Sequence, residues 1–132
     1  MYYLDTNICV YFLKGKYPQV MEKIKKINPI EIKIASIVKA ELLYGAEKSQ
    51  NKETNKNLII KFLEPFEIKD FDDKCTIEYS KIRSALELKG TTIGPNDYII
   101  ASTVLSNDGI LITNNVDEFK RIKNLRIENW TK

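Results

Sequence analysis

Gly94-Pro95-Asn96-Asp97-Tyr98-Ile99-Ile100-Ala101 decides how the rest of the chain can fold. The Gly-Pro pair ends the preceding segment, and Pro95 suits the first turn of a helix, where its missing N–H is not needed. The helical face that follows is apolar and consists of Ile100, Ala101, Val104 and Leu105. Asp97 lies three residues before Ile100, so helical spacing places its carboxylate at the head of that face. A buried carboxylate is costly unless it is paired, hydrogen-bonded or metal-bound, and the chain has no histidine to pair with it.

The composition indicates one globular domain spanning residues 1–132. Hydrophobic residues make up 43% and charged residues 30%, which is ordinary for a soluble protein with a proper core. The net charge of +3 is compatible with nucleic-acid binding and equally with ordinary surface lysines. No segment reaches the roughly 18 apolar residues of a membrane helix, and the N-terminus has no signal-peptide pattern. We therefore expect no membrane association.

Several kinds of site are excluded by residue counts. Cys9 and Cys75 lie far apart without a paired Cys or His, which argues against zinc and against a disulfide framework. Both are expected to be core thiols in a reducing cytoplasm. Without histidine, no Ser-His or Cys-His pair can form, and none of the five glycines belongs to a phosphate-binding loop.

Short apolar strands alternate with helical segments along the whole chain. Strands are expected at residues 2–4, 32–35, 66–68, 110–113 and 126–128, and helices at 8–15, 20–27, 36–49, 58–65, 72–89, 95–106 and 117–122. Ser36 is interpreted as an N-cap, residues 51–55 as a polar break, and Glu41 as sharing a helical stripe with Ile37, Ala40 and Tyr44. The pattern predicts an α/β fold, a three-layer α/β/α domain whose central, mainly parallel sheet has four to five strands.

Three acidic residues are expected to meet at one edge of this sheet. Asp5 ends the first strand, Asn114 and Asn115 end the fourth, and Glu41 and Asp97 lie in early turns of helices. The carboxyl ends of parallel strands form the functional crevice of such sheets. Carboxylates suit Mg²⁺ or Mn²⁺, which can activate a water and polarise a phosphodiester.

Each of these residues also has an ordinary structural interpretation. Asp5 fits a helix N-cap, Glu41 a solvent-facing position, Asp97 a partner of the helix dipole, and Asn114-Asn115 a plain turn. The metal-site hypothesis has the advantage that it explains all three acids at once.

The motifs that carry a family resemblance are Leu4-Asp5-Thr6-Asn7, residues 40–46, Ile82-Arg83 with Leu86-Glu87 and Gly90, residues 93–97 with Ile100-Ala101, residues 112–115, and Glu118-Phe119 with Asn129-Trp130. In this order they resemble a PIN domain of the VapC toxin type, from residue 2 to residue 130. The resemblance implies an Mg²⁺-dependent (or Mn²⁺-dependent) endoribonuclease that inhibits translation as the toxin of a type II toxin–antitoxin pair. It also implies that the catalytic and metal-binding residues are Asp5, Glu41 and Asp97. The auxiliary residues would be Thr6, Asn7, Thr113, Asn115 and Glu118.

One position departs from the family pattern. Many PIN domains have a fourth acid two residues after the Thr of the last motif, and here that residue is Asn115. Glu118 or Asp117 could substitute for it. Because Asn115 adds no charge, the departure weakens the expectation of a second tightly bound metal. It leaves the expectation of the first metal unchanged.

The resemblance also implies partners and a substrate. It predicts a homodimer, a VapB-type antitoxin whose C-terminal segment lies over the acidic groove, and contact with DNA only through that antitoxin. Residues 41–50, 94–97 and 128–130 look most like the branch that cuts tRNA, with the anticodon stem-loop of initiator tRNA as a candidate. Lysines could hold the stem phosphates, namely Lys14, Lys16, Lys48 and Lys52. Arg83 is either a phosphate-binding residue or a surface ion-pairing residue.

Two other classes compete with the nuclease. A phosphoacceptor domain or a haloacid-dehalogenase-like phosphatase also places an Asp at a strand end. The phosphatase needs a second Asp two residues later, where this chain has Asn7. Neither kind of protein explains Glu41. An interaction module with purely structural acids is the third class, and it would show no cation-dependent change.

Overall fold

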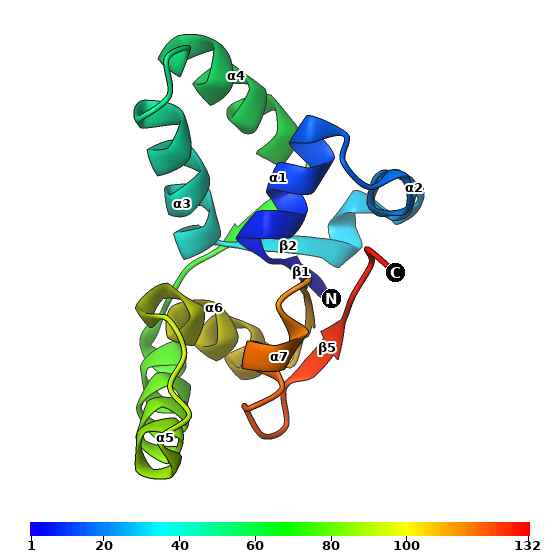
Figure 1. The fold of residues 1–132 in the computed structure, drawn as a ribbon. Coiled ribbons are helices and arrows are strands. Elements are labelled where there is room, and N and C mark those ends of the chain that lie inside the picture. Colours follow the sequence, from blue (N-terminus) through cyan, green and yellow to red (C-terminus); the bar gives the residue numbers. More distant parts are fainter.

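The computed structural model describes all residues from 1 to 132, and a five-stranded sheet lies at its centre (Figure 1). The strands are β1 (Tyr2–Leu4), β2 (Ile32–Ala35), β3 (Glu67–Lys69), β4 (Ile110–Ile112) and β5 (Arg126–Glu128). Their order is β3-β2-β1-β4-β5, and all four pairings are parallel. β1 is the middle strand, and its last residue Leu4 pairs with Ile112 of β4. The residues that follow these strands, Asp5 and Thr113, therefore leave the sheet side by side.

Helices cover both faces of the sheet, which confirms the α/β prediction. They are α1 (Thr6–Lys14), α2 (Pro18–Lys26), α3 (Ser36–Glu47), α4 (Lys52–Leu63), α5 (Asp73–Lys89), α6 (Pro95–Ser106) and α7 (Val116–Phe119), with a short 3₁₀ turn η1 at Pro29–Glu31. In Figure 1, α1 to α4 lie on one side of the sheet and α5, α6 and α7 on the other. Because both faces are covered, the strands are short apolar runs and not alternating ones.

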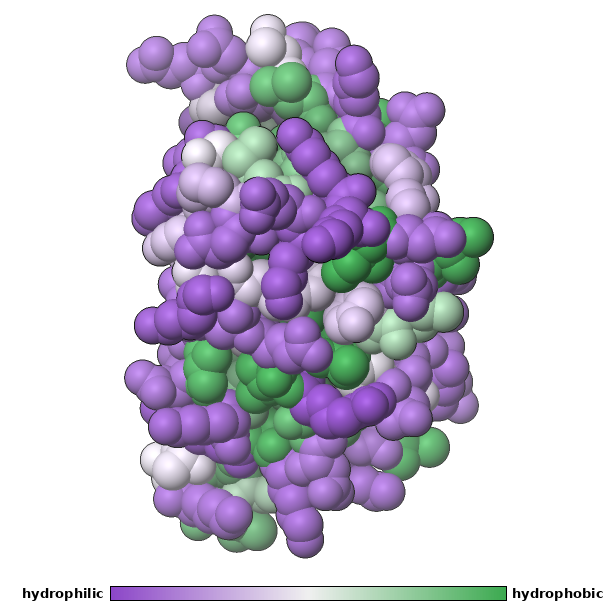
Figure 2. Space-filling model, turned by 90° about the vertical axis from the view of Figure 1, so that its right-hand side faces the viewer, coloured by the Kyte–Doolittle hydropathy of each residue, from purple (hydrophilic) through white to green (hydrophobic).

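The core is continuous through the sheet and both helical layers. It includes strand residues such as Leu4, Ile34 and Leu111 together with Ile100 and Val104 of α6. Cys9 and Cys75 are free and buried, as expected of core thiols. On the face seen in Figure 2, hydrophobic residues gather in small groups among hydrophilic ones. None of the helices has the length and apolar character needed to cross a membrane.

Several helix boundaries follow from local chemistry as predicted. Gly15 and Gly90 end α1 and α5 in the left-handed conformation, with φ of 64° and 70°. Glycine adopts this conformation without the clash that a Cβ atom would cause. Asp72 caps α5 by accepting a hydrogen bond from the N–H of Cys75. Pro95 begins α6 within its first turn.

Two expectations for α3 are wrong. Ser36 is the first residue of α3 and not its cap, because β2 runs directly into the helix and Ala35 occupies the cap position in an extended conformation. The buried face of α3 consists of Val38, Leu42 and Ala46. Of the predicted stripe, Ile37 is only partly buried, Ala40 is exposed, and Tyr44 is 65% exposed.

The expected polar break at residues 51–55 is largely helical, because α4 begins at Lys52. Its first turns are polar because they face solvent, and polarity alone does not separate an exposed helix from a loop. The last helix is also shorter than expected, since α7 covers only Val116–Phe119.

Candidate active site

Asp5 is held at the centre of the sheet edge by groups from two elements. It is only 5% exposed. Its Oδ1 accepts a 2.8 Å hydrogen bond from the N–H of Thr6, and its Oδ2 accepts a 2.7 Å bond from the Thr113 hydroxyl. Burial raises the pKa of Asp5, the two hydrogen bonds lower it, and the charges of Glu41 and Glu118 raise it again. Asp5 is thus both the N-cap of α1 and a member of an acidic group.

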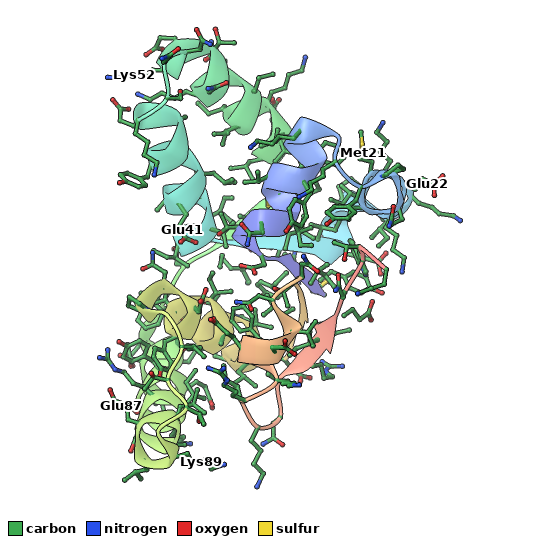
Figure 3. The ribbon with its side chains drawn as sticks, viewed as in Figure 1. Met21, Glu22, Glu41, Lys52, Glu87 and Lys89 are labelled. Atoms are coloured by element: carbon green, nitrogen blue, oxygen red, sulfur yellow. The ribbon has the colours of Figure 1, made fainter.

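Glu41 reaches this edge from α3 and joins α1 to α6. Its Oε1 accepts a 2.6 Å hydrogen bond from the Thr6 hydroxyl, and its Oε2 accepts a 3.2 Å bond from the Asn96 amide. Figure 3 shows Glu41 near the end of α3 that meets the sheet. The carboxylate therefore has a fixed position although the side chain is only partly buried.

Asp97 is the carboxylate at this edge with the largest shift in pKa. Its pKa is raised to about 7, chiefly by burial, then by the charges of Asp5, Glu118 and Glu41 and a hydrogen bond with Glu118. Gly94 makes room for it, because a Cβ atom at Gly94 would lie 3.0 Å from Oδ2 of Asp97. The Gly-Pro pair thus ends one segment and also leaves space for the carboxylate.

Glu118, and not Asp117, is the acid of α7 that faces the others. The Asn115 amide donates a 2.9 Å hydrogen bond to Oε2 of Glu118, and the charge of Glu118 raises the pKa of both Asp5 and Asp97. The Asp117 side chain is 91% exposed and pairs with Lys120 at 3.3 Å. We call Asp5, Glu41, Asp97 and Glu118 the acidic centre.

The remaining site candidates divide into two groups. Thr6, Thr113 and Asn115 each donate a hydrogen bond to a carboxylate of the acidic centre. Asn7 is exposed and its side chain makes no hydrogen bond. Arg83 has neither a hydrogen bond nor an ion pair to the acidic centre. It contacts Tyr79, Tyr98 and Glu87 instead.

Sequence reasoning missed two contributors, Asn96 and Gly94. Both belong to the stretch that opens α6, where Asn96 directly precedes Asp97. A polar side chain next to a buried acid is a signal that could have identified Asn96. The role of Gly94 depends on the space around Asp97, which the sequence does not reveal.

The acidic centre fits a hard divalent cation bound partly through water. No three His, Cys, Asp or Glu side chains converge closely enough to enclose a metal by themselves. Mg²⁺ characteristically keeps several waters and uses only one or two carboxylates, so a closed protein shell is not required. The donors are all oxygens. Burial first, and then the charges of neighbouring acids, raise the pKa of Asp5 and Asp97, and a bound cation would relieve the repulsion between these acids.

The fold and the site define a three-layer α/β domain with acids gathered at the carboxyl edge of a parallel sheet. The PIN domain family matches residues 2–125, and the chain belongs to that family. It is 48% identical over 135 residues to Ribonuclease VapC2 of Rickettsia felis, covering 100% of this chain and 99% of the relative. It is 39% identical over 127 residues to the tRNA(fMet)-specific endonuclease VapC of Salmonella typhimurium, covering 96% of each.

Solved structures agree with this assignment. VapBC2 from Rickettsia felis bound to a promoter DNA fragment superposes with a TM-score of 0.92 at 45% identity, over 98% of both chains. DNA-bound VapBC from Salmonella typhimurium also gives a TM-score of 0.92, at 39% identity over 98% of this chain and 97% of that one. The chain is therefore a VapC-type member of a nuclease family, which replaces the phosphoacceptor interpretation.

Proposed function

We propose that this protein is a divalent-cation-dependent endoribonuclease that acts as the toxin of a type II toxin–antitoxin pair and inhibits translation by cleaving tRNA. The observation that carries the proposal is the acidic centre, where four separate segments each contribute an acid and where burial, followed by the charges of Asp5, Glu118 and Glu41, raises the pKa of Asp97 to about 7. Such crowding costs stability unless it serves binding or catalysis. In a VapC-type chain, that use is phosphodiester hydrolysis.

Each acid has a distinct task in this proposal. Mg²⁺ or Mn²⁺ held by Asp5, Glu41 and Asp97 would polarise the phosphodiester and lower the pKa of a water. The hydrogen bonds from Thr6 and Thr113 favour the ionised form of Asp5 and oppose the burial that raises its pKa. Asp97 has a pKa close to neutrality, which suits a group that holds or accepts a proton at physiological pH.

The substrate we propose is tRNA, with the anticodon stem-loop of initiator tRNA as the specific target. Relatives from Salmonella typhimurium and Shigella flexneri carry the name tRNA(fMet)-specific endonuclease. A domain of this size presents a small acidic centre and cannot read a long sequence. It must recognise a shape with an unpaired, splayed backbone, which an anticodon loop provides.

The partner we propose is a VapB-type antitoxin bound to a homodimer of this chain. The two solved structures cited above are described as VapBC bound to DNA, which supports an antitoxin that carries the DNA contact. A pocket of about 450 Å³ between α1, α3 and α4 is lined by Thr6 and Glu41 together with apolar residues such as Leu42 and Ile59. An antitoxin segment could fill it with an apolar side chain and place an Arg or Lys on the acidic centre.

Incubation of the purified protein with total tRNA and Mg²⁺, followed by mapping of the new 5′ ends, tests the function. We expect one cluster of ends in the anticodon stem-loop of initiator tRNA and no cleavage in EDTA. Asp5→Asn and Asp97→Asn should abolish cleavage and growth inhibition while the fold is retained. Cleavage of ribosomal or messenger RNA with intact tRNA would reject the substrate, and full activity of either variant would reject the proposed site.

The antitoxin proposal has its own test. The protein co-purified with the product of the neighbouring reading frame should lose nuclease activity and bind its promoter DNA, whereas the protein alone should not bind that DNA. A complex that keeps full nuclease activity would contradict the model of a segment lying over the acidic centre.

A further inference from the structure

A second pocket, of about 260 Å³, lies away from the acidic centre, between α5, the end of α6 and the segment after α7. Its floor is apolar and includes Ile82, Leu86, Leu105 and Ile122. Its rim is basic and carries Lys81, Lys89, Arg121 and Lys123. Figure 3 shows Lys89 at the end of α5, well separated from Glu41. The volume lies below the roughly 300 Å³ at which pockets for whole small molecules begin, so it suits a phosphate with its sugar.

The four cations of this rim have no acidic partner. The protein forms seven ion pairs, and none of them includes a rim residue. Glu78 is the only acid in the pocket wall, and it lies in none of the seven pairs. Elsewhere some cations are paired, for example Lys33 with Glu67 at 2.7 Å and Lys56 with Glu47 at 2.5 Å, and others, such as Lys25 and Lys26, are in none of the seven pairs. What distinguishes the rim is that four unpaired cations surround one pocket, with Glu78 as the only acid in its wall.

One rim residue is fixed in place and connects the pocket to the acidic centre. Arg121 donates a 2.9 Å hydrogen bond from Nη1 to the carbonyl of Thr92, in the loop that leads to Asp97. Along the chain, Arg121 lies three residues after Glu118. Asn124 shapes the segment further through its left-handed conformation, with φ of 70°. Arg121 is thus attached to both segments that carry acids of this edge, the loop that leads to Asp97 and the segment that follows Glu118.

We propose that this basic pocket binds backbone phosphates of the RNA substrate at a distance from the cleaved bond. The inference rests on the proposed ribonuclease function and extends it to a second contact with the same substrate. The acidic centre repels an RNA backbone, so affinity must come from cations elsewhere on the surface. The fork of Arg121 suits a phosphate, and the apolar floor suits the carbon face of a ribose.

Binding measurements in a non-cleaving background test this role. The Asp97→Asn protein is titrated into fluorescein-labelled tRNA, in EDTA, at several salt concentrations. Lys89→Glu with Lys123→Glu should weaken binding roughly tenfold or more at low salt and reduce the slope of log affinity against log salt by roughly 1.5, the loss expected for two phosphate contacts. Lys25→Glu with Lys26→Glu is the matched control, since it makes the same charge change on exposed, unpaired lysines of α2.

Each outcome decides between the basic pocket and its alternatives. Equal weakening by the two double variants would mean that only net charge matters and would overturn the proposal. Unchanged tRNA binding by the rim variant, together with lost binding of a poly-glutamate peptide, would assign the pocket to an acidic protein and also overturn it. A wild-type protein that binds tRNA through the rim but cleaves no RNA would instead contradict the proposed function alone.

Discussion

The Thr113 hydroxyl donates a 2.7 Å hydrogen bond to Oδ2 of Asp5, although 108 positions separate the two residues in the chain. Both residues directly follow neighbouring parallel strands, so the register of β1 and β4 sets this contact. Thr113 is fully buried and also accepts a 2.9 Å hydrogen bond from the N–H of Asn115. It therefore links the central carboxylate to the residue that holds Glu118.

Thr113→Val should lower activity while it leaves the fold intact. The change removes a hydrogen bond that lowers the pKa of Asp5, so that pKa should rise further and the acid limb of the pH–rate profile should move to higher pH. Loss of such an orienting partner typically costs about 10- to 100-fold in activity or metal affinity. Thr103→Val is the control, because its hydroxyl bonds only the carbonyl of Ile99 in its own helix. An unshifted profile in Thr113→Val would contradict this role.

Asp97 should make the metal-free protein less stable as the pH rises. The folded-state pKa of about 7 lies above the ordinary pKa of an aspartate, 3.8, so between these pH values the folded chain holds a proton that the unfolded chain has released. The free energy of unfolding should therefore fall from about pH 4 to about pH 7 and then level off. Chemical denaturation in EDTA should show this decline. Asp97→Asn should reduce it and raise stability at pH 8, and an unchanged slope in that variant would assign it to other groups.

Divalent cations should reverse this loss of stability. A cation that binds only the folded protein stabilises it by about 2.7 kcal/mol at a concentration 100 times its dissociation constant. Mg²⁺ or Mn²⁺ at pH 8 should thus raise the melting temperature of the wild type and have much less effect on Asp5→Asn. Equal shifts in both proteins would show that the cation binds elsewhere.

Gly94→Ala should reduce activity without reducing stability. The added Cβ atom would lie 3.0 Å from Oδ2 of Asp97 and would displace that carboxylate. Displacement of a reacting group by about 1 Å can cost roughly 100-fold in rate. The backbone of Gly94, with φ of −61° and ψ of 151°, accepts alanine, so the melting temperature should hold or rise slightly.

Gly45→Ala is the control for this substitution. A Cβ atom there meets nothing within 4 Å, and alanine in a helix interior should raise stability by about 0.5–1 kcal/mol with activity unchanged. Full activity in Gly94→Ala would mean that Asp97 tolerates the displacement.

The sequence predicted the sheet and its acidic edge because both depend on local signals. Buried strands are short apolar runs, and Asp5 marks the end of one of them. The buried face of α3 was missed because two sets of residues both follow helical spacing. Ile37, Ala40 and Tyr44 form the predicted set, whereas Val38, Leu42 and Ala46 form the set that is buried. The sequence also could not predict which side chains meet in the acidic centre. Asp117 and Glu118 are adjacent, and only the course of α7 turns one of them inward.

The metal-binding roles of Asp5, Glu41 and Asp97 remain predictions that the experiments above address. The contact between Asn96 and Glu41 joins residues 55 positions apart, so it depends on how α3 and α6 pack. No local pattern could have predicted it. The same holds for the space beside Gly94, which exists only in the folded chain.

Arg83 supplies the last prediction, because its surroundings favour a structural role over a phosphate contact. Its guanidinium donates to the Tyr79 hydroxyl and to Glu87, and it lies 5.6 Å from the centre of the Tyr98 ring. The Tyr98 hydroxyl in turn accepts a 3.3 Å hydrogen bond from the N–H of Ile93, one residue before Gly94. Arg83 thus supports the loop that places Asp97, while its own side chain is 45% exposed.

Arg83→Ala and Arg83→Lys separate the two roles. A supporting role requires the planar guanidinium, so both variants should lower the melting temperature and the turnover of every RNA to a similar extent. A contact with the RNA backbone gains most of its strength from charge, so lysine would then restore most of the activity and tRNA affinity that alanine loses. Glu87→Gln is the control, since it weakens an exposed ion pair that solvent screens and should change neither quantity strongly. Rescue by lysine at an unchanged melting temperature would overturn the structural assignment and return Arg83 to the RNA-binding surface.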